Sequence, residues 1–133
     1  MQTKNIYIVE DDNDDFIFIN EAMKSIAPDV TFQRFASAEK LFECILLEEG
    51  QPALFIIDYN LPLQNGLQVL SRLNGMENFK DVPKVFYSNS NFSQHKVNAL
   101  SGGAAAYFTK SGNMDAIRQD VLEMLLFSNP GVL

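Results

Sequence analysis

Short apolar runs alternate along the chain with longer stretches in which apolar residues recur every three or four positions. A short apolar run between turn residues is typical of a strand, and the longer pattern is typical of one helix face. The runs predict five strands: Ile6–Val9, a half-exposed segment with Val30, Phe32 and Phe35, then Ala53–Ile57, Val85–Tyr87 and Ala105–Phe108. The run Ala53–Ile57 is continuous, as expected of a strand that is buried on both faces.

Five helices are predicted between and after these strands. The first ends before Pro28, and Ser37 is the expected N-cap of the second, which runs to Leu47. The apolar positions of the first helix are Phe16, Ile19, Ala22, Met23 and Ile26. Those of the last three are Leu67, Leu70 and Leu73; Val97 and Leu100; and Met114, Ile117, Val121, Leu122 and Leu125. Strands and helices that alternate at this spacing indicate an α/β fold with a parallel, doubly wound sheet.

The composition is typical of one globular domain spanning residues 1–133. Of the 133 residues, 47% are hydrophobic, and the net charge of −7 argues against direct binding of nucleic acid. No apolar run approaches the roughly 18 residues of a membrane span, and the N-terminus does not have the pattern of a signal peptide. We therefore expect no membrane contact and a cytoplasmic location. The single cysteine, Cys44, lies in an apolar helical pattern, which predicts a buried, inert thiol.

Five acidic residues occupy six positions directly after the first predicted strand: Glu10, Asp11, Asp12, Asp14 and Asp15. Acids are favoured at a helix N-terminus by the helix dipole, which explains Asp12, Asp14 and Asp15. Glu10 and Asp11 immediately follow a buried strand, where like charges raise the free energy unless a cation is near. Because Mg²⁺ prefers carboxylate ligands, we interpret Glu10 and Asp11 as the metal side of a site.

Asp58 and Lys110 directly follow two other predicted strands. The carboxyl ends of parallel strands meet at one edge of the sheet, so these residues are expected to lie near Glu10 and Asp11. A carboxylate in that position can act as a nucleophile and form an aspartyl phosphate, with a metal and a lysine offsetting the charge. The alternative is that Asp58 accepts hydrogen bonds from backbone N–H groups of the loop that follows it.

Three motifs in this order resemble the receiver domain of bacterial two-component response regulators. They are Val9-Glu10-Asp11-Asp12, then Ile57-Asp58-Tyr59-Asn60-Leu61-Pro62 with Gly66, and Tyr107-Phe108-Thr109-Lys110. The resemblance extends from Ile6 to about Phe127. It implies a flavodoxin-like fold with five parallel strands in the order 2-1-3-4-5 and five helices. It also implies a stand-alone receiver domain without an output domain.

The resemblance assigns a role to each site residue. Asp58 would be the phosphoacceptor, Lys110 would contact the phosphoryl oxygens, and Ser88 would hydrogen-bond the phosphoryl group. Mg²⁺ would be bound by Glu10, Asp11, Asp58 and the backbone carbonyl of Asn60. Tyr107 would change rotamer on activation, and Asn60 and Ser90 would flank the phosphoryl group and influence its lifetime. The structural alternatives are a turn-capping serine for Ser88, an edge-strand aromatic for Tyr107 and a surface lysine for Lys110.

Three positions depart from the family pattern. Asn89 replaces a residue that is usually small, so its amide would crowd or bond the phosphoryl site. Ala106 stands where many relatives carry an acid. Ser111 replaces the usual proline after Lys110, and a trans Lys110–Ser111 bond is predicted because a cis bond without proline costs ~3–4 kcal/mol.

The expected function is a phosphoacceptor switch rather than an enzyme. A histidine kinase or histidine phosphotransfer protein would donate the phosphoryl group, because the only histidine, His95, is expected to be an exposed bystander. Output would pass to an unidentified downstream protein through the face formed by the fourth helix, the fifth strand and the last helix. Leu126 and Phe127 lie outside the apolar face that the last helix is expected to bury. They are therefore a candidate homodimer interface.

Three other functions remain as alternatives. An interaction module that does not depend on phosphate is suggested by Asn89 and Ser111. A phosphohydrolase of the haloacid dehalogenase type would need a second acid two positions after Asp58, where this chain has Asn60. Flavodoxin-like cofactor binding would need a phosphate-binding loop after the first strand, where this chain has acids.

Overall fold

Each predicted strand joins one parallel sheet in the computed structural model, which describes residues 4–47 and 50–128. The strands are β1 (Asn5–Val9), β2 (Thr31–Phe35), β3 (Leu54–Ile57), β4 (Lys84–Ser88) and β5 (Ala106–Thr109). They pair in the order β2-β1-β3-β4-β5, and every pair is parallel. The predicted fold class and strand order are confirmed, and the predicted strand ends differ from those observed by at most one residue.

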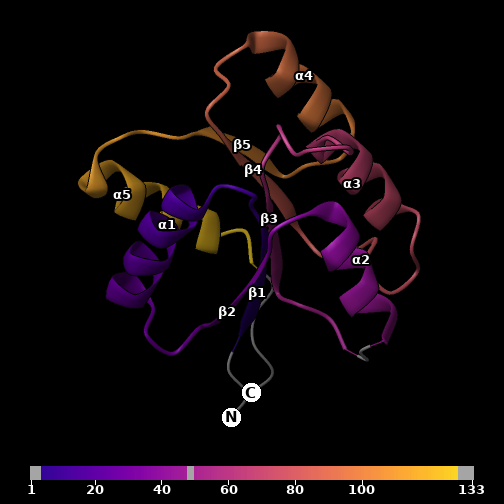
Figure 1. Ribbon diagram of the computed structural model, residues 1–133, viewed down its shortest axis with the longest axis horizontal. Coiled ribbons are helices and arrows are strands. Elements are labelled where there is room, and N and C mark those ends of the chain that lie inside the picture. The colour runs from indigo at the N-terminus through magenta and orange to yellow at the C-terminus, as the bar shows by residue number, and fades with distance from the viewer. Residues whose placement is uncertain (1–3, 48–49, 129–133) are drawn as a thin grey trace.

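Five helices cover the two faces of this sheet (Figure 1). They are α1 (Asn13–Ile26), α2 (Ala38–Leu47), α3 (Gly66–Asn74), α4 (Ser93–Ser101) and α5 (Met114–Leu125). Helices α1 and α5 lie together on one face, and α2, α3 and α4 lie on the other. Every strand is therefore followed by a helix that returns the chain to the same end of the sheet, as parallel pairing requires.

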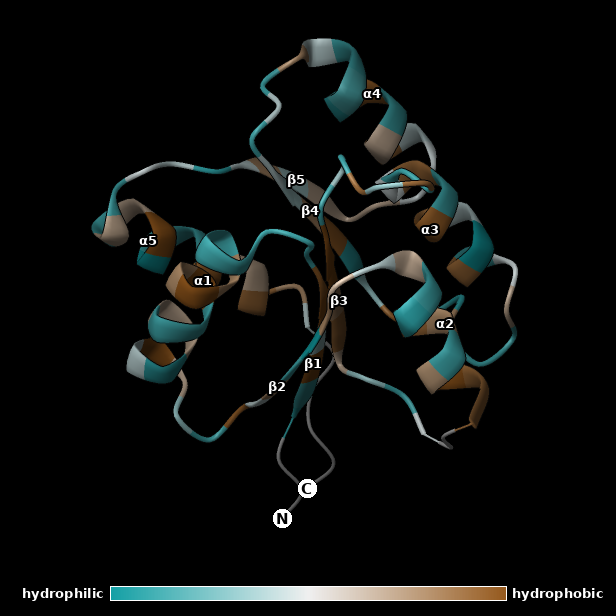
Figure 2. Ribbon diagram, in the orientation of Figure 1, coloured by the Kyte–Doolittle hydropathy of each residue, from teal (hydrophilic) through white to brown (hydrophobic). Residues whose placement is uncertain are grey.

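Alternate strand residues belong to two separate cores. In β1, Ile6 and Ile8 pack with α1 and α5, whereas Tyr7 and Val9 pack with the helices of the opposite face. The four residues of β3 alternate in the same way and are all buried. Figure 2 shows the resulting hydrophobic strands between helices whose outer faces are hydrophilic. Because both faces are covered, the central strands contain few polar positions, and polar side chains collect where the strands end.

Side-chain caps hold the starts of several helices. The Asp12 carboxylate accepts a hydrogen bond from the Asp15 N–H at 2.9 Å at the start of α1. Ser37 Oγ accepts one from the Lys40 N–H at 3.2 Å, which confirms the predicted cap of α2. Asn65 and Gln68 form a reciprocal capping box at α3. These caps help to set where each loop at the carboxyl edge of the sheet ends.

Three predictions about helix faces are wrong, and the first concerns α4, where Val97 and Leu100 are exposed and Ala99 is buried instead. Cys44 is half-buried rather than buried, and it packs at the margin of the core between α2 and the sheet. Leu122 is exposed, because the buried stripe of α5 consists of Ile117, Val121 and Met124. Leu126 is also exposed, at 80% of its surface, and lies outside that stripe as expected.

One prediction about the backbone agrees with the structure. The Lys110–Ser111 peptide bond is trans, as are all the bonds within the described ranges. Among residues 4–47 and 50–128, no helix is both long enough and apolar enough to cross a lipid bilayer.

Candidate functional site

The ends of four strands bring the predicted site residues to one edge of the sheet. The hydrogen-bonded ladder continues just past the strands, where the Asp58 N–H donates to the Val9 carbonyl at 3.0 Å. In the same way, the Lys110 N–H donates to the Ser88 carbonyl at 2.7 Å. Residues that directly follow β3 and β5 are thereby held beside the ends of β1 and β4. The predicted convergence at the carboxyl edge follows from this register.

Lys110 is the centre of the site. Its side chain is buried, and its ammonium group contacts Asp58 Oδ2 at 3.0 Å, Asp15 Oδ2 at 2.9 Å and Glu10 Oε1. Burial by itself would lower the pKa of Lys110, but the nearby carboxylates, led by Asp58, outweigh it and raise the pKa above the ordinary value. The lysine therefore stays charged, and its three N–H donors are aimed at three acids.

Glu10 is almost fully buried, at 1% exposure. Burial, followed by the charge of Asp58, raises the pKa of Glu10 to about 8, although Lys110 acts in the opposite direction. Burial is the larger cause, because it disfavours the charged form of the Glu10 carboxyl group. The second carboxylate oxygen of Glu10 accepts a hydrogen bond from the Asp12 N–H at 3.2 Å, which fixes the orientation of the carboxyl group.

Asp58 lies beside Glu10 with its two carboxylate oxygens in different surroundings. Oδ2 faces Lys110, and Oδ1 accepts a hydrogen bond from the backbone N–H of Asn60 at 3.0 Å. The loop hydrogen bond that was the alternative explanation is thus present together with the ion pair. Both contacts orient the carboxylate, and Asp58 keeps 7% of its surface exposed at the edge of the sheet.

Glu10, Asp11 and Asp58 suit a hard divalent cation. One carboxylate oxygen from each lies within 4.8 Å of the others, and Asp11 is exposed whereas the other two are buried. Oxygen ligands of this kind are those that Mg²⁺ prefers. With Asp15, the site holds four acidic side chains and one ammonium group, so a divalent cation would offset negative charge there. The backbone N–H of exposed Asn60 points to Asp58, and the role of its carbonyl stays a prediction.

Asp15 lies at the helix N-terminus as predicted, but it also belongs to the site, so the helix dipole explains only part of its role. It lies in the first turn of α1 and bonds Lys110, and its Oδ2 is 3.5 Å from the amide nitrogen of Asn89. The sequence carried no signal for this contact, because Asp11 precedes α1 and shares no helix face with Asp15, and Lys110 is distant in the chain. Asp12, in contrast, is the helix cap that was predicted.

Ser88 ends β4 and is fully buried. Its Oγ accepts a hydrogen bond from the Ser90 N–H at 3.3 Å, so the turn-capping alternative describes one of its contacts. A hydroxyl group that accepts in this way keeps its own proton to donate. Asn89, the next residue, is exposed and directed to Asp15.

Tyr107 and His95 lie in an aromatic cluster next to the site. The Tyr107 hydroxyl donates to the Ser90 carbonyl at 2.7 Å, and its ring lies 6.0 Å from that of Phe86. His95 is half-buried, and its ring stacks on Tyr59 at 4.0 Å between centroids. The expectation that His95 is an exposed bystander is therefore wrong, and the polar residues around it in the sequence gave no sign of the contact.

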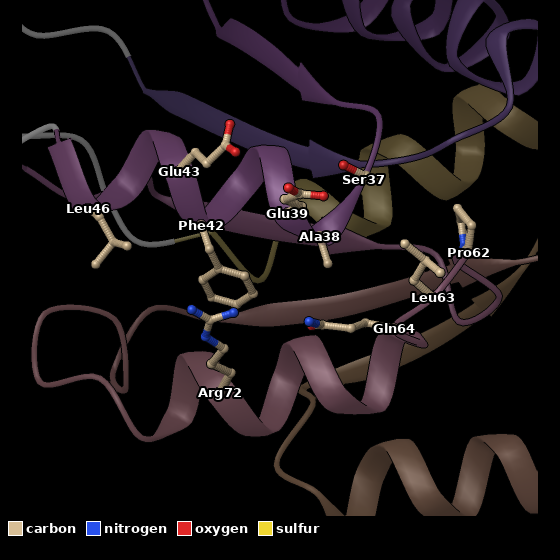
Figure 3. Close-up of a pocket in the computed structure, with 10 residues that line it drawn as sticks. All are labelled: Ser37, Ala38, Glu39, Phe42, Glu43, Leu46, Pro62, Leu63, Gln64 and Arg72. Atoms are coloured by element: carbon tan, nitrogen blue, oxygen red, sulfur yellow. The ribbon is translucent and has the colours of Figure 1, made fainter.

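Two hollows lie at the surface near these elements. A cavity of about 130 Å³ adjoins the site and is lined by residues that include Asp15, Phe18, Asn89 and Lys110. A larger one, of about 280 Å³, lies between α2 and α3, where the Arg72 guanidinium group stacks over the Phe42 ring (Figure 3). The larger cavity is not lined by any residue of the acidic site, whereas the smaller one adjoins that site through Asp15 and Lys110.

Known proteins that resemble this chain indicate the family to which it belongs. The family model for the response regulator receiver domain matches residues 6–122. The nitrate/nitrite response regulator protein NarL of Escherichia coli K12 is 36% identical over 102 residues, which are 76% of this chain and 44% of NarL. This chain therefore spans less than half of the length of that relative. Sporulation initiation phosphotransferase F of Bacillus subtilis is 25% identical over 126 residues, which are 94% of this chain and 96% of that protein.

A solved structure shares the fold. The phosphorylated cyanobacterial phytochrome response regulator RcpA aligns with a TM-score of 0.85 and 24% sequence identity, covering 95% of this chain and 94% of that chain. The family model covers most of the residues, and the acidic cluster, Asp58 and Lys110 meet at one edge of a 2-1-3-4-5 sheet. The chain therefore belongs to the family of response regulator receiver domains.

Proposed function

We propose that this receiver domain accepts a phosphoryl group on Asp58 from a phosphohistidine of a partner protein. The observation that carries the proposal is the position of Asp58, buried beside two further acids and paired with Lys110 at 3.0 Å. His95, the only histidine of this sequence, packs against Tyr59 and bonds Ser90 instead of facing Asp58, so the proposed donor is a separate protein. The partner would be a histidine kinase or a histidine phosphotransfer protein, and the similarity to a sporulation initiation phosphotransferase supports a role in phosphoryl transfer.

The residues of this chain have distinct tasks in the transfer. A carboxylate oxygen of Asp58 attacks phosphorus, the bond between phosphorus and the donor imidazole nitrogen breaks, and the imidazole leaves with the electron pair. Lys110 pairs with the phosphoryl oxygens as their charge approaches Asp58. The Ser88 hydroxyl group donates a hydrogen bond to the phosphoryl group. Glu10, Asp11, Asp58 and the Asn60 carbonyl would hold Mg²⁺, which supplies positive charge and orients the phosphoryl group.

The output of this switch would be a change at the face formed by α4, β5 and α5. Tyr107 lies in β5 and bonds the loop that leads to α4, so a movement of that loop would alter the surroundings of the tyrosine ring. The phosphoryl group would in this way favour one of two pre-existing arrangements. A downstream protein that binds one arrangement better would respond to phosphorylation.

Intact mass spectrometry tests the proposal. The protein is incubated with Mg²⁺ and phosphoramidate, and a mass increase of one phosphoryl group is expected for the wild type and not for Asp58→Asn. Asp12→Asn is the matched control, because Asp12 caps α1 in the same acidic run without contacting Lys110. A wild-type mass that stays unchanged, alongside a receiver domain known to react, would refute the proposal.

A further inference from the structure

Ser90, in the loop between β4 and α4, is held by side chains from three elements. Its N–H donates to Ser88 Oγ of β4 at 3.3 Å, and its carbonyl accepts from the Tyr107 hydroxyl of β5 at 2.7 Å. Its Oγ lies 2.6 Å from Nδ1 of His95 in α4 and also accepts from the Phe92 N–H at 3.3 Å. The position of this one residue therefore depends on a strand end, an edge strand and a helix.

His95 connects the same loop to the residue after the phosphoacceptor. Its ring stacks on Tyr59 with centroids 4.0 Å apart and planes inclined by 15°. Tyr59 follows Asp58 directly, is buried, and accepts a hydrogen bond from the Gly66 N–H at its carbonyl, so it forms a fixed support. His95 consequently contacts two loops, the one after β3, which carries Tyr59, and the one after β4, which carries Ser90.

Helix α4 has few other attachments at this end. Ala99 is its only buried residue within the described ranges, and its N-cap residue, Phe92, makes no side-chain cap hydrogen bond. The first turn is therefore anchored mainly through His95. Loss of the contact to Ser90 would remove one of the contacts that hold Ser90, whose N–H group donates to Ser88 Oγ.

We propose that His95 is a positioning residue for phosphoryl transfer, which holds Ser90 and through it the hydroxyl group of Ser88. This inference rests on the proposed function, in which Ser88 donates a hydrogen bond to the phosphoryl group. The Ser90 N–H fills one acceptor position of Ser88 Oγ, so the hydroxyl group keeps its own proton to donate in another direction. The ring of Tyr59 sets the plane in which His95 meets Ser90.

A double-mutant cycle tests the connection. His95→Phe keeps a ring on Tyr59 and removes Nδ1, whereas Ser90→Ala removes the hydroxyl group and keeps the backbone N–H. The rate of phosphorylation by phosphoramidate with Mg²⁺ is measured for both single variants, the double variant and Lys96→Ala, a control at an exposed position of α4. Each single variant is expected to react roughly fivefold more slowly, the effect of one hydrogen bond. The double variant is expected to be no slower than the slower single variant, and Lys96→Ala should match the wild type.

The outcomes separate this inference from the proposed function. If the wild type is phosphorylated and His95→Phe reacts at the same rate, the inference is wrong while the proposed function stands. If the two single effects multiply in the double variant, they do not act through one hydrogen bond, and the inference is also overturned. A wild type that takes up no phosphoryl group removes both. Thermal melts of all variants exclude unfolding at the assay temperature as the cause of a slower rate. Ser90→Ala removes the same bond, together with the acceptor of the Phe92 N–H, without changing a residue of α4.

Discussion

Replacing Lys110 with methionine tests how much the central ammonium group contributes to the stability of the fold. The side chain is 6% exposed and bonds three carboxylates, of which Glu10 and Asp58 are buried. Removing one partner of a buried ion pair costs about 3–5 kcal/mol, because the remaining charge has no compensation. Glu10 limits this cost, since its pKa of about 8 allows it to take up a proton. We therefore expect the free energy of unfolding to fall by about 3 kcal/mol, the lower end of that range.

The assay is urea unfolding followed by circular dichroism in buffer without divalent cations. Lys80→Met is the matched control, because Lys80 pairs with Glu77 at 3.2 Å on the surface with 46% and 86% of the side chains exposed. Such a surface pair contributes about 0.3 kcal/mol. If both methionine variants lose the same stability, the burial of the Lys110 network has no energetic consequence and the reasoning is refuted.

Three further predictions follow from other contacts. Burial lowers the pKa of Lys84 from 10.5 to about 8, although Asp81 acts in the opposite direction. The folded state therefore binds fewer protons than the unfolded state between these pH values, and the wild type should gain up to about 3 kcal/mol relative to Lys84→Met as the pH rises through that window. Urea unfolding at both ends of the window measures this, and a constant difference contradicts it. Gly66→Ala should lower the melting temperature and slow phosphorylation, since a Cβ there would lie 2.5 Å from the Asp58 carbonyl oxygen and from Phe86. A variant as stable and as reactive as the wild type would disprove this close approach. Mg²⁺ at a hundredfold excess over its Kd should stabilise the wild type by about 2.7 kcal/mol, and Asp11→Asn should reduce this gain in a calorimetric melt. An equal gain in both proteins would exclude Asp11 as a ligand.

Much of the fold and most of the site could be predicted from the chain. The strands were visible because segments buried on both faces are continuous apolar runs, and the helices because one apolar face repeats every three or four residues. Glu10, Asp58 and Lys110 were visible for a related reason. Each directly follows an apolar strand, where a charged side chain is costly unless it has a partner.

The tertiary structure decided the contacts between residues that are distant in the chain. Asp15 meets Lys110 across 95 positions, so its role depends on how α1 lies against the end of β5. His95 stacks on Tyr59 only because α4 packs over the loop after β3, and no local pattern encodes that contact. The exposed side of α5 was decided in the same way, since α1 and the sheet cover Val121 and leave Leu122 in solvent. Local patterns determine secondary structure, because burial and hydrogen bonding repeat along a short segment. A functional site needs side chains from distant parts of the chain, and only tertiary packing brings these together.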